Sequence, residues 1–228
     1  MTEFVFLDAD DTILDFHQAE RAALTKTLTD FGVEPTNAVL ARYHIINRQH
    51  WEALERGELS RTQVQEGRFR VLFEELGRDI DLVAVARSFE HNLGIGHYFL
   101  PGAEAAVQTL HQKYRLFLAT NGIASVQRSR LTSAGLYPYF EQVFISQDMG
   151  ENKPSKEFFE ACFAKIRGFD RARAIMVGDS LTSDILGGIR AGMKTCWINP
   201  AHEPPRADIR PDYEIESLSQ LPALLAGL

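Results

Sequence analysis

Five short apolar runs, separated by longer segments with helical periodicity, constrain the fold of this 228-residue chain more than any other feature. The runs lie at residues 4–7, 116–119, 143–145, 174–177 and 195–198. Continuous apolar runs of this length, flanked by turn-forming or polar residues, are typical of strands buried on both faces of a parallel sheet. We therefore predict an α/β fold with a Rossmann-like, doubly wound parallel sheet.

One long region interrupts this alternation. Between about residues 16 and 91 the sequence shows helical periodicity and no run that is typical of a strand. This gap between the first and second predicted strands is too long for an ordinary crossover connection. We therefore predict an all-helical domain of residues 16–97, inserted into an α/β core made of residues 1–15 and 98–228.

Composition and charge limit the classes of partner. The formal net charge is −7, and no block of Lys or Arg stands out, which disfavours nucleic acid polymers and anionic membranes as partners. An anionic substrate would therefore need a local device such as a metal ion, a helix N-terminus or a single lysine. Because no signal peptide and no apolar segment of membrane-spanning length is recognisable, we expect a cytoplasmic protein.

Cysteine, histidine and glycine patterns exclude several other sites. Cys162 and Cys196 lie far apart, each within an apolar stretch, so we expect two reduced core thiols rather than a disulfide or a metal pair. The seven histidines show no ligand spacing, which argues against zinc chemistry. The sequence GIGH at residues 94–97 lacks the third glycine of a dinucleotide-binding loop, and we interpret it as a hinge.

Polar residues follow the predicted strands at the points where they end. Ligands of open parallel sheets bind beyond the carboxyl ends of the strands, which makes these positions candidate functional residues. Each one alone has a simpler role as a helix cap or a turn residue, but their joint occurrence favours a functional site. The candidates are Asp8, Asp10, Asp11, Thr120, Asn121, Gly122, Lys153, Gly178, Asp179, Ser180 and Asp184.

These residue types predict phosphate chemistry assisted by a metal ion. Crowded carboxylates repel one another, a hard divalent cation relieves the repulsion, and oxygen ligands favour Mg²⁺. The ion would attract a phosphate dianion, while Lys153 and the Thr120 hydroxyl neutralise the remaining phosphate oxygens. A carboxylate close to a bound phosphorus can attack it and form an aspartyl phosphate. Asp10 would point to the same side as Asp8, and so could serve as the acid and base.

Four motifs, in this order along the chain, resemble those of the haloacid-dehalogenase-type phosphohydrolases. DADDT at residues 8–12 is similar to the first motif, DxDx[TV], and Thr120 in LATNG is similar to the Ser or Thr of the second. Lys153 in NKP is similar to the third-motif Lys, and GDSLTSD at 178–184 to the fourth motif, GDxxxxD. Asp11 departs from the commoner first motif, in which many relatives have Gly. We assign Asp11 to a turn and give it no chemical role.

The resemblance implies catalytic and metal-binding roles for four aspartates. Asp8 would be the nucleophile and a metal ligand. Asp10 would be the acid and base and would also contribute its backbone carbonyl to the metal. Asp179 would be the remaining protein ligand, and Asp184 would bind the metal or orient its water. Family members that do not hydrolyse phosphoesters carry other residues two positions after the nucleophile, so Asp10 favours a phosphatase.

The resemblance also implies a phosphate site and a cofactor. Thr120 and Lys153 would hold the transferred phosphoryl group, helped by the amide of Asn121. The implied cofactor is Mg²⁺, with Mn²⁺ as an alternative. The implied partner is a small phosphomonoester and neither a nucleic acid polymer nor a membrane.

The helical insert resembles the C1-type cap of the same family, which closes over the substrate and shapes specificity. Its segments NRQHW (47–51) and QEGRF (65–69) are most similar to the pyrimidine 5'-nucleotidase subgroup, which implies a pyrimidine nucleoside monophosphate as substrate. Trp51 and Phe69 would stack on the base, and Asn47 or Arg68 would hydrogen-bond to its edge or to the sugar. Alternatively, the aromatic residues form the core of the cap and Arg68 is a solvated or paired charge.

Other functions stay open at this point. Within the enzyme class, the alternative is a phosphatase or phosphomutase for sugar phosphates or phosphoglycolate. A phosphoacceptor signalling domain would be shorter, and an inactive scaffold would have lost at least one catalytic residue. A mutase needs basic residues in the cap for a second phosphate, and the candidates are Arg42, Arg48, Arg56, Arg61, Arg68 and Arg70.

Overall fold

A six-stranded parallel sheet organises the computed structural model, which describes residues 1–204 and 206–228. The strand order is β3-β2-β1-β4-β5-β6, with the first strand of the chain at the centre. This arrangement confirms the predicted doubly wound α/β fold. The strands are β1 (Phe4–Leu7), β2 (Arg115–Thr120), β3 (Gln142–Ile145), β4 (Ala174–Gly178), β5 (Lys194–Ile198) and β6 (Tyr213–Ile215).

The edge strand β6 is the strand that the sequence does not predict. It has three residues, Tyr213, Glu214 and Ile215, and Ile215 is the buried one. This short segment at one edge of the sheet contains the charged residue Glu214 and lacks the continuous apolar run that marks the other five strands. Its pairing with β5 in parallel register creates the strand.

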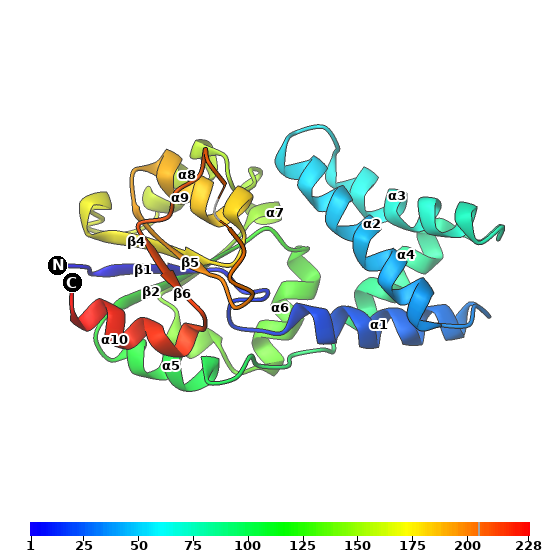
Figure 1. Ribbon diagram of the computed structural model, residues 1–228, viewed down its shortest axis with the longest axis horizontal. Helices are drawn as coiled ribbons and strands as arrows, with labels where there is room; N and C mark the ends of the chain where they lie inside the picture. The colour runs from blue at the N-terminus through cyan, green and yellow to red at the C-terminus, as the bar shows by residue number, and fades with distance from the viewer. Residues whose placement is uncertain (205) are drawn as a thin grey trace. The chain divides into compact units, whose positions relative to one another are not determined.

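The chain divides into two compact units, which we call the core unit and the helical unit. The core unit comprises Met1–Phe16 and His97–Leu228, and the helical unit comprises His17–Gly96. Within the core unit, α5 and α10 lie on one face of the sheet and α8 and α9 on the other (Figure 1). The helices of the core unit are α5 (Ala103–His111), α6 (Ala124–Ser133), α7 (Ser146–Met149), α8 (Lys156–Phe163), α9 (Leu186–Ala191) and α10 (Leu221–Ala226).

Alternation along β1 builds the two hydrophobic layers of the core unit. Val5 and Leu7 pack with buried side chains of α5 and α10, whereas Phe4 and Phe6 pack with the aromatic side chains of α8. All four side chains are 0% exposed, as expected for a central strand covered on both faces. Cys162 and Cys196 are buried in these layers as free thiols. The result is a rigid sheet whose loops at the carboxyl ends are free to carry polar residues.

Four helices form the helical unit: α1 (Phe16–Asp30), α2 (Asn37–Glu55), α3 (Arg61–Glu75) and α4 (Leu82–Leu93). Side-chain caps start three of them. The hydroxyl of Thr36 accepts from Val39 N, Ser60 and Gln63 form a reciprocal capping box, and Asp81 accepts from the first turn of α4. No helix in the described part of the chain is long and apolar enough to cross a membrane.

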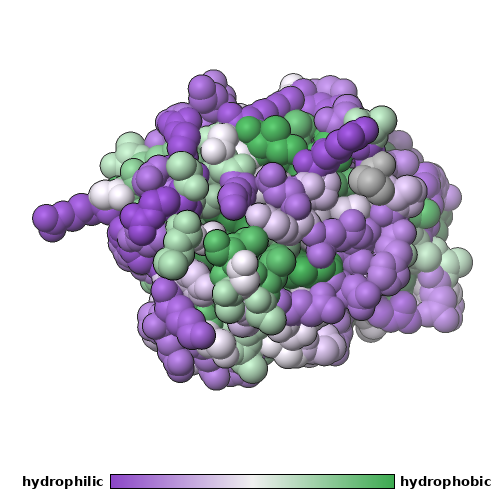
Figure 2. All heavy atoms as spheres, turned by 60° about the vertical axis from the view of Figure 1, so that its left-hand side comes forward, coloured by the Kyte–Doolittle hydropathy of each residue, from purple (hydrophilic) through white to green (hydrophobic). Residues whose placement is uncertain are grey.

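The surface is mainly hydrophilic on the face drawn in Figure 2, where apolar side chains form small groups among polar ones. The exposed large apolar residues are scattered along the sequence, among them Ile45, Val83, Ile95 and Ile189. Scattered exposed apolar residues are normal for a folded chain.

Candidate active site

Three carboxylates meet beyond the carboxyl ends of β1 and β4. Asp8 follows β1 directly, and its backbone N–H donates to Val177 O at 3.0 Å, which ties the start of the loop to the neighbouring strand. Asp8, Asp179 and Asp184 each offer an oxygen such that these atoms lie within 4.8 Å of one another. Asp8 is 7% exposed and Asp184 is 1% exposed. The fold thus brings together the three side chains to which the resemblance gives metal-binding roles.

Lys153 is the cation of this cluster. Its Nζ donates to Asp8 Oδ1, to Asp184 Oδ1 and to Ala119 O, each at 2.6 Å. The side chain is fully buried, with 1% of the residue exposed. All three hydrogens of the ammonium therefore have acceptors, one of them at the end of β2. This geometry places a fixed positive charge directly against the predicted nucleophile.

The electrostatics of the cluster show that it lacks positive charge. Burial raises the pKa of Asp8 to about 8, although Lys153 opposes the shift. Burial, followed by the charges of Asp184 and Asp8, raises the pKa of Asp179 well above its usual value. Burial alone would lower the pKa of Lys153, but the carboxylates of Asp184 and Asp8 raise it. Three carboxylates facing one ammonium thus leave an excess of two negative charges, which favours proton uptake.

A divalent cation fits this donor set. The ligand atoms are carboxylate oxygens, which suit Mg²⁺, and its two positive charges would match the excess negative charge of the cluster. Asp8, Asp179 and Asp184 are the side chains that would hold the ion.

Gly178 and the turn after it shape the position of Asp184. A Cβ on Gly178 would lie 2.1 Å from Asp184 Oδ2, so no larger residue fits there without moving that carboxylate. Asp184 lies in a single π-helical turn, Leu181–Ile185. Its Oδ2 accepts from Ser180 N at 3.1 Å, which leaves Oδ1 for Lys153. Local backbone geometry therefore aims the carboxylate into the cluster.

The side chain of Asn121 hydrogen-bonds to the loop that carries Lys153. Its Nδ2 donates to Lys153 O at 2.8 Å and to Ser183 Oγ at 3.1 Å, and its Oδ1 accepts from Lys153 N at 2.8 Å. The side chain thus links the loops after β2, β3 and β4. The resemblance assigns an amide of Asn121 to phosphate, and that assignment stays a prediction.

Asp10 and Thr120 are joined through residues that the sequence does not single out. Gln127 Nε2 donates to Asp10 Oδ2 at 2.9 Å and to Thr120 Oγ1 at 2.8 Å, and Arg130 forms an ion pair with Asp10 Oδ1. Gly122 N also donates to Thr120 Oγ1, at 3.2 Å. Gln127 and Arg130 belong to α6, whose sequence ASVQRSRLTS is so polar that no pattern separates them from its exposed residues.

Asp11 lies in the turn predicted for it. Its φ of 51° is in the left-handed region, and its Oδ1 accepts from Phe16 N at 3.0 Å. Glycine adopts such a left-handed backbone freely, which is consistent with the Gly of the commoner first motif. The acidic side chain adds a hydrogen bond to the start of α1 that glycine lacks.

The predicted specificity residues of the helical unit contact one another or its core. Asn47 is 3% exposed, donates to Glu20 Oε1 at 2.6 Å and accepts from Arg68 Nη1 at 2.9 Å. Phe69 is 0% exposed and its ring packs against Tyr43 and Phe89. Phe69 is therefore a core residue, contrary to the expectation that it stacks on a base.

Arg68 and Trp51 differ in environment. Arg68 is 1% exposed, its Nη1 donates to Asn47 and its guanidinium carbon lies 4.9 Å from the ring centroid of Phe89, so it is a buried charge with neutral partners rather than a solvated one. Trp51 is half-buried, and the guanidinium carbon of Arg61 lies 5.9 Å from its ring centroid. Trp51 thus keeps part of its surface available.

Two histidines that are far apart in the sequence, His17 and His44, lie close together in the structure. In the helical unit, His17, Glu20 and His44 each offer a possible ligand atom within 4.8 Å of the others. Glu20 is buried, and both its oxygens already accept hydrogen bonds, Oε1 from Asn47 and Oε2 at 2.7 Å from His44 Nδ1. We interpret this group as the partly exposed end of a polar network that joins α1, α2 and α3 through Glu20, Asn47 and Arg68.

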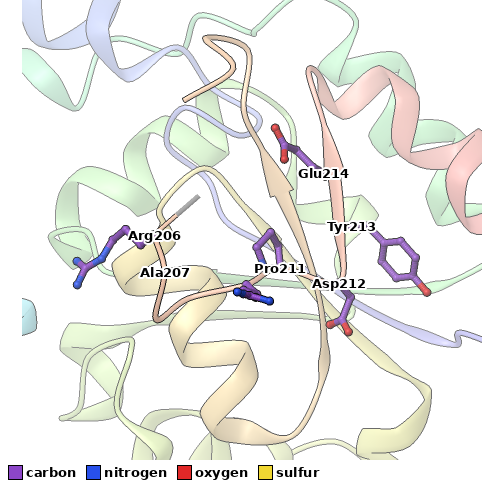
Figure 3. A pocket seen from close by; sticks show the side chains of 7 residues that line it. Arg206, Ala207, Pro211, Asp212, Tyr213 and Glu214 are labelled. Carbon is purple, nitrogen blue, oxygen red and sulfur yellow. The ribbon is translucent and has the colours of Figure 1, made fainter. Parts of the chain in front are cut away.

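The pocket in Figure 3 is formed by another part of the core unit. It has a volume of about 420 Å³ and is lined by residues 206, 207 and 210–214, a segment that leads into β6. Arg206 pairs with Asp208 at 3.0 Å, and Asp212 accepts from Thr195 N at 2.8 Å. None of the residues predicted to be catalytic lines this pocket, so the cluster beyond β1 and β4 is the better candidate active site.

The chain is similar to known hydrolases over nearly its full length. Residues 2–192 match the family model of the haloacid dehalogenase-like hydrolases. The chain is 38% identical to pyrimidine 5'-nucleotidase PynA of Streptococcus pneumoniae, over 96% of this chain and 93% of that protein. It is 32% identical to pyrimidine 5'-nucleotidase YjjG of Escherichia coli, over 98% and 97%.

The putative hydrolase YfnB of Bacillus subtilis is 39% identical, over 95% of this chain and 92% of that protein. A crystal structure of YfnB bound to magnesium superposes with a TM-score of 0.94 at 38% identity, and covers 98% of each chain. These similarities confirm the resemblance that the four motifs indicate.

Proposed function

Because the chain belongs to the haloacid dehalogenase-like hydrolase family, we propose that it is a Mg²⁺-dependent phosphomonoesterase that works through an aspartyl phosphate. We further propose a pyrimidine nucleoside 5'-monophosphate as its substrate. The observation that carries the phosphatase proposal is the cluster at the carboxyl ends of the strands, where buried Lys153 pairs with Asp8 and Asp184 and where Asp179 offers a third carboxylate close to theirs.

In the proposed first step, an oxygen of Asp8 attacks the phosphorus. The bond from Asp8 to phosphorus forms, the bond to the ester oxygen breaks, and a proton from Asp10 moves to the leaving alcohol. In the second step, water attacks the aspartyl phosphate and gives its proton to Asp10, and the bond between Asp8 and phosphorus breaks. Phosphate leaves, and both carboxyl groups return to their starting state.

The surrounding residues supply charge and orientation. Lys153 is held 2.6 Å from Asp8 Oδ1, so its ammonium would lie beside the transferred phosphoryl group. The Thr120 hydroxyl, fixed by Gln127 and Gly122, would donate to a phosphoryl oxygen. Mg²⁺ held by Asp8, Asp179 and Asp184, with Mn²⁺ as an alternative, would supply further positive charge for the phosphate dianion.

The substrate proposal is supported by the relatives and by the charges of the helical unit. PynA and YjjG, which align over almost the whole chain, are named pyrimidine 5'-nucleotidases. A mutase would need arginines available for a second phosphate. Of the six candidate arginines, Arg68 is buried, and Arg42, Arg48 and Arg56 form exposed ion pairs with Glu75, Glu52 and Glu58. We propose that the helical unit acts as the cap and that Trp51 is its candidate base-stacking residue.

Rates of phosphate release from a panel of esters test both the phosphatase proposal and the nucleotidase proposal. We expect phosphate release with Mg²⁺ to be faster for UMP, dUMP and dTMP than for phosphoglycolate or sugar phosphates, and to stop with EDTA. Faster turnover of sugar phosphates would contradict the nucleotidase proposal and leave the phosphatase proposal standing. We expect Asp8→Asn to abolish turnover on every ester, and near-normal activity of this variant would contradict the assignment of the nucleophile.

A further inference from the structure

Two side chains of α6 hold both carboxylate oxygens of Asp10. Arg130 forms an ion pair with Oδ1, and Gln127 Nε2 donates to Oδ2 at 2.9 Å. Arg130 is 0% exposed and Gln127 is 1% exposed, whereas the Asp10 side chain keeps 26% of its surface exposed. The donors are therefore buried in the core unit, and the carboxylate that they hold stays partly accessible.

The two donors are themselves fixed. Arg130 Nη1 donates to Gln127 Oε1 at 3.0 Å, which is possible because residues three apart lie on the same face of a helix. Gln127 Nε2 also donates to Thr120 Oγ1 at 2.8 Å. The Arg130 guanidinium carbon lies 5.9 Å from the ring centroid of Phe16. These contacts, most of them buried, restrict the rotamers of Arg130 and Gln127.

Stability alone gives a weak reason for this arrangement. Burying a guanidinium is unfavourable unless it is paired, and an apolar side chain of similar volume is often as stable. The carboxylate with which the structure pairs Arg130 is Asp10, the proposed acid and base. The effect that the pairing supplies is therefore the orientation of Asp10 relative to the site.

We infer that Arg130 and Gln127 are positioning residues for Asp10 in the proposed phosphoryl transfer. The inference rests on the proposed function, in which Asp10 gives a proton to the leaving oxygen and then takes one from water. A carboxyl group has about four acceptor sites, so two donors leave room for the transferred proton. Gln127, which bonds to both Asp10 and Thr120, sets the acid and base at a fixed place relative to the residue proposed to hold the phosphoryl group.

The first test compares leaving groups. The ratio kcat/KM reports the steps up to aspartyl phosphate formation, and it should depend on Asp10 when the leaving alcohol needs a proton. We expect Arg130→Met to lower kcat/KM for UMP by about 100-fold. We expect a loss of less than about 5-fold for p-nitrophenyl phosphate, whose leaving group departs without a proton. Equal losses on the two esters would overturn the inference.

Arg128→Met is the matched control. Arg128 lies on the same helix, two residues before Arg130, but forms an exposed ion pair with Asp148 at 2.6 Å. We expect this variant to keep kcat/KM on both esters within about 2-fold of wild type, as is usual for exposed pairs. If Arg130→Met does not fold, as judged by circular dichroism, Arg130→Lys and Gln127→Met provide the same comparison of the two esters.

A double-mutant cycle provides the second test. If Arg130 acts through Asp10, the variant with both Asp10→Asn and Arg130→Met loses no more activity on UMP than Asp10→Asn alone. Additive losses would overturn the inference, because Arg130 would then act independently of Asp10. A wild-type protein that hydrolyses neither ester would instead contradict the proposed function, so the two failures are distinguishable.

Discussion

Asp11 occupies a backbone conformation that most residues avoid. Its φ is 51°, and its Oδ1 accepts from Phe16 N at 3.0 Å. A β-carbon in the left-handed region costs about 1–2 kcal/mol, and Asp and Asn tolerate that region because their short polar side chains bond locally. Asp11 therefore meets two requirements of the turn, the conformation and an acceptor for the first N–H of α1.

Substitutions of Asp11 separate these two requirements. We expect Asp11→Ala to lower the free energy of unfolding by about 2 kcal/mol, because it loses the acceptor and keeps the strained conformation. Asp11→Gly should be less destabilising by about 1 kcal/mol, because glycine adopts positive φ freely. Urea unfolding measures both. Asp11→Asn, which keeps an acceptor oxygen, is the control, and equal stability of the Ala and Gly variants would contradict the role of φ.

At the scale of elements, apolar runs predict the fold, and motif positions predict which side chains gather at the carboxyl ends of the strands. β1, β2, β4 and β5 are visible in the sequence because they lie inside the sheet and are covered on both faces, which demands continuous apolar runs. β3 lies at one edge of the sheet, and its short apolar run, which ends in the buried residues Phe144 and Ile145, still marks it. The strand β6 is not visible, because an edge strand of three residues needs little apolar surface.

The residues that orient the site are harder to predict. Arg128 and Arg130 are alike in sequence and share α6, yet Arg128 forms an exposed ion pair and Arg130 is buried against Asp10. The contact between Asp10 and Arg130 joins positions 120 residues apart, and helical periodicity carries no information about it. For the same reason, Phe69 looks like a possible stacking residue in sequence and is a core residue in the structure.

Asn47 is either a buried structural residue of the network that joins α1, α2 and α3 or a residue that contacts the substrate. A substitution can distinguish these two interpretations. The amide of Asn47 bridges the buried carboxylate of Glu20 and the buried guanidinium of Arg68, with bonds of 2.6 and 2.9 Å. Asn47→Ala would leave both charges without this partner, and we expect a loss of about 2–4 kcal/mol in the free energy of unfolding. Chemical denaturation measures it.

The control for this substitution is Asn37→Ala at the start of the same helix. Asn37 accepts an exposed hydrogen bond from Arg21 at 2.7 Å, and we expect its loss to change stability by less than about 0.5 kcal/mol. A stable Asn47→Ala variant with a selectively raised KM for pyrimidine nucleotides would contradict the structural role and favour direct contact with the substrate.

At the scale of the whole molecule, charge connects the fold with the proposed cofactor. The chain carries a formal net charge of −7, and its candidate active site adds three carboxylates against the ammonium of Lys153. Such a protein repels a phosphate dianion unless a local positive charge is added. The same excess of carboxylates makes the stability of the metal-free protein depend on pH, which offers a measure of metal binding that does not rely on activity.

The stabilisation by Mg²⁺ should therefore increase with pH. The pKa of Asp8 is about 8 in the folded protein because of burial, against 3.8 as its ordinary value, so between these values the folded state binds more protons than the unfolded state. This contribution to stability is fully present below about pH 4 and is lost as pH rises through about 8. Mg²⁺ competes with the proton for the carboxylates, so thermal unfolding should show a larger increase in Tm with Mg²⁺ over EDTA at pH 8.5 than at pH 5.5.

Asp179→Asn, which removes one of the crowded charges, should reduce this difference in the increase of Tm between the two pH values. An increase in Tm that is the same at both pH values would contradict a metal bound by this carboxylate cluster.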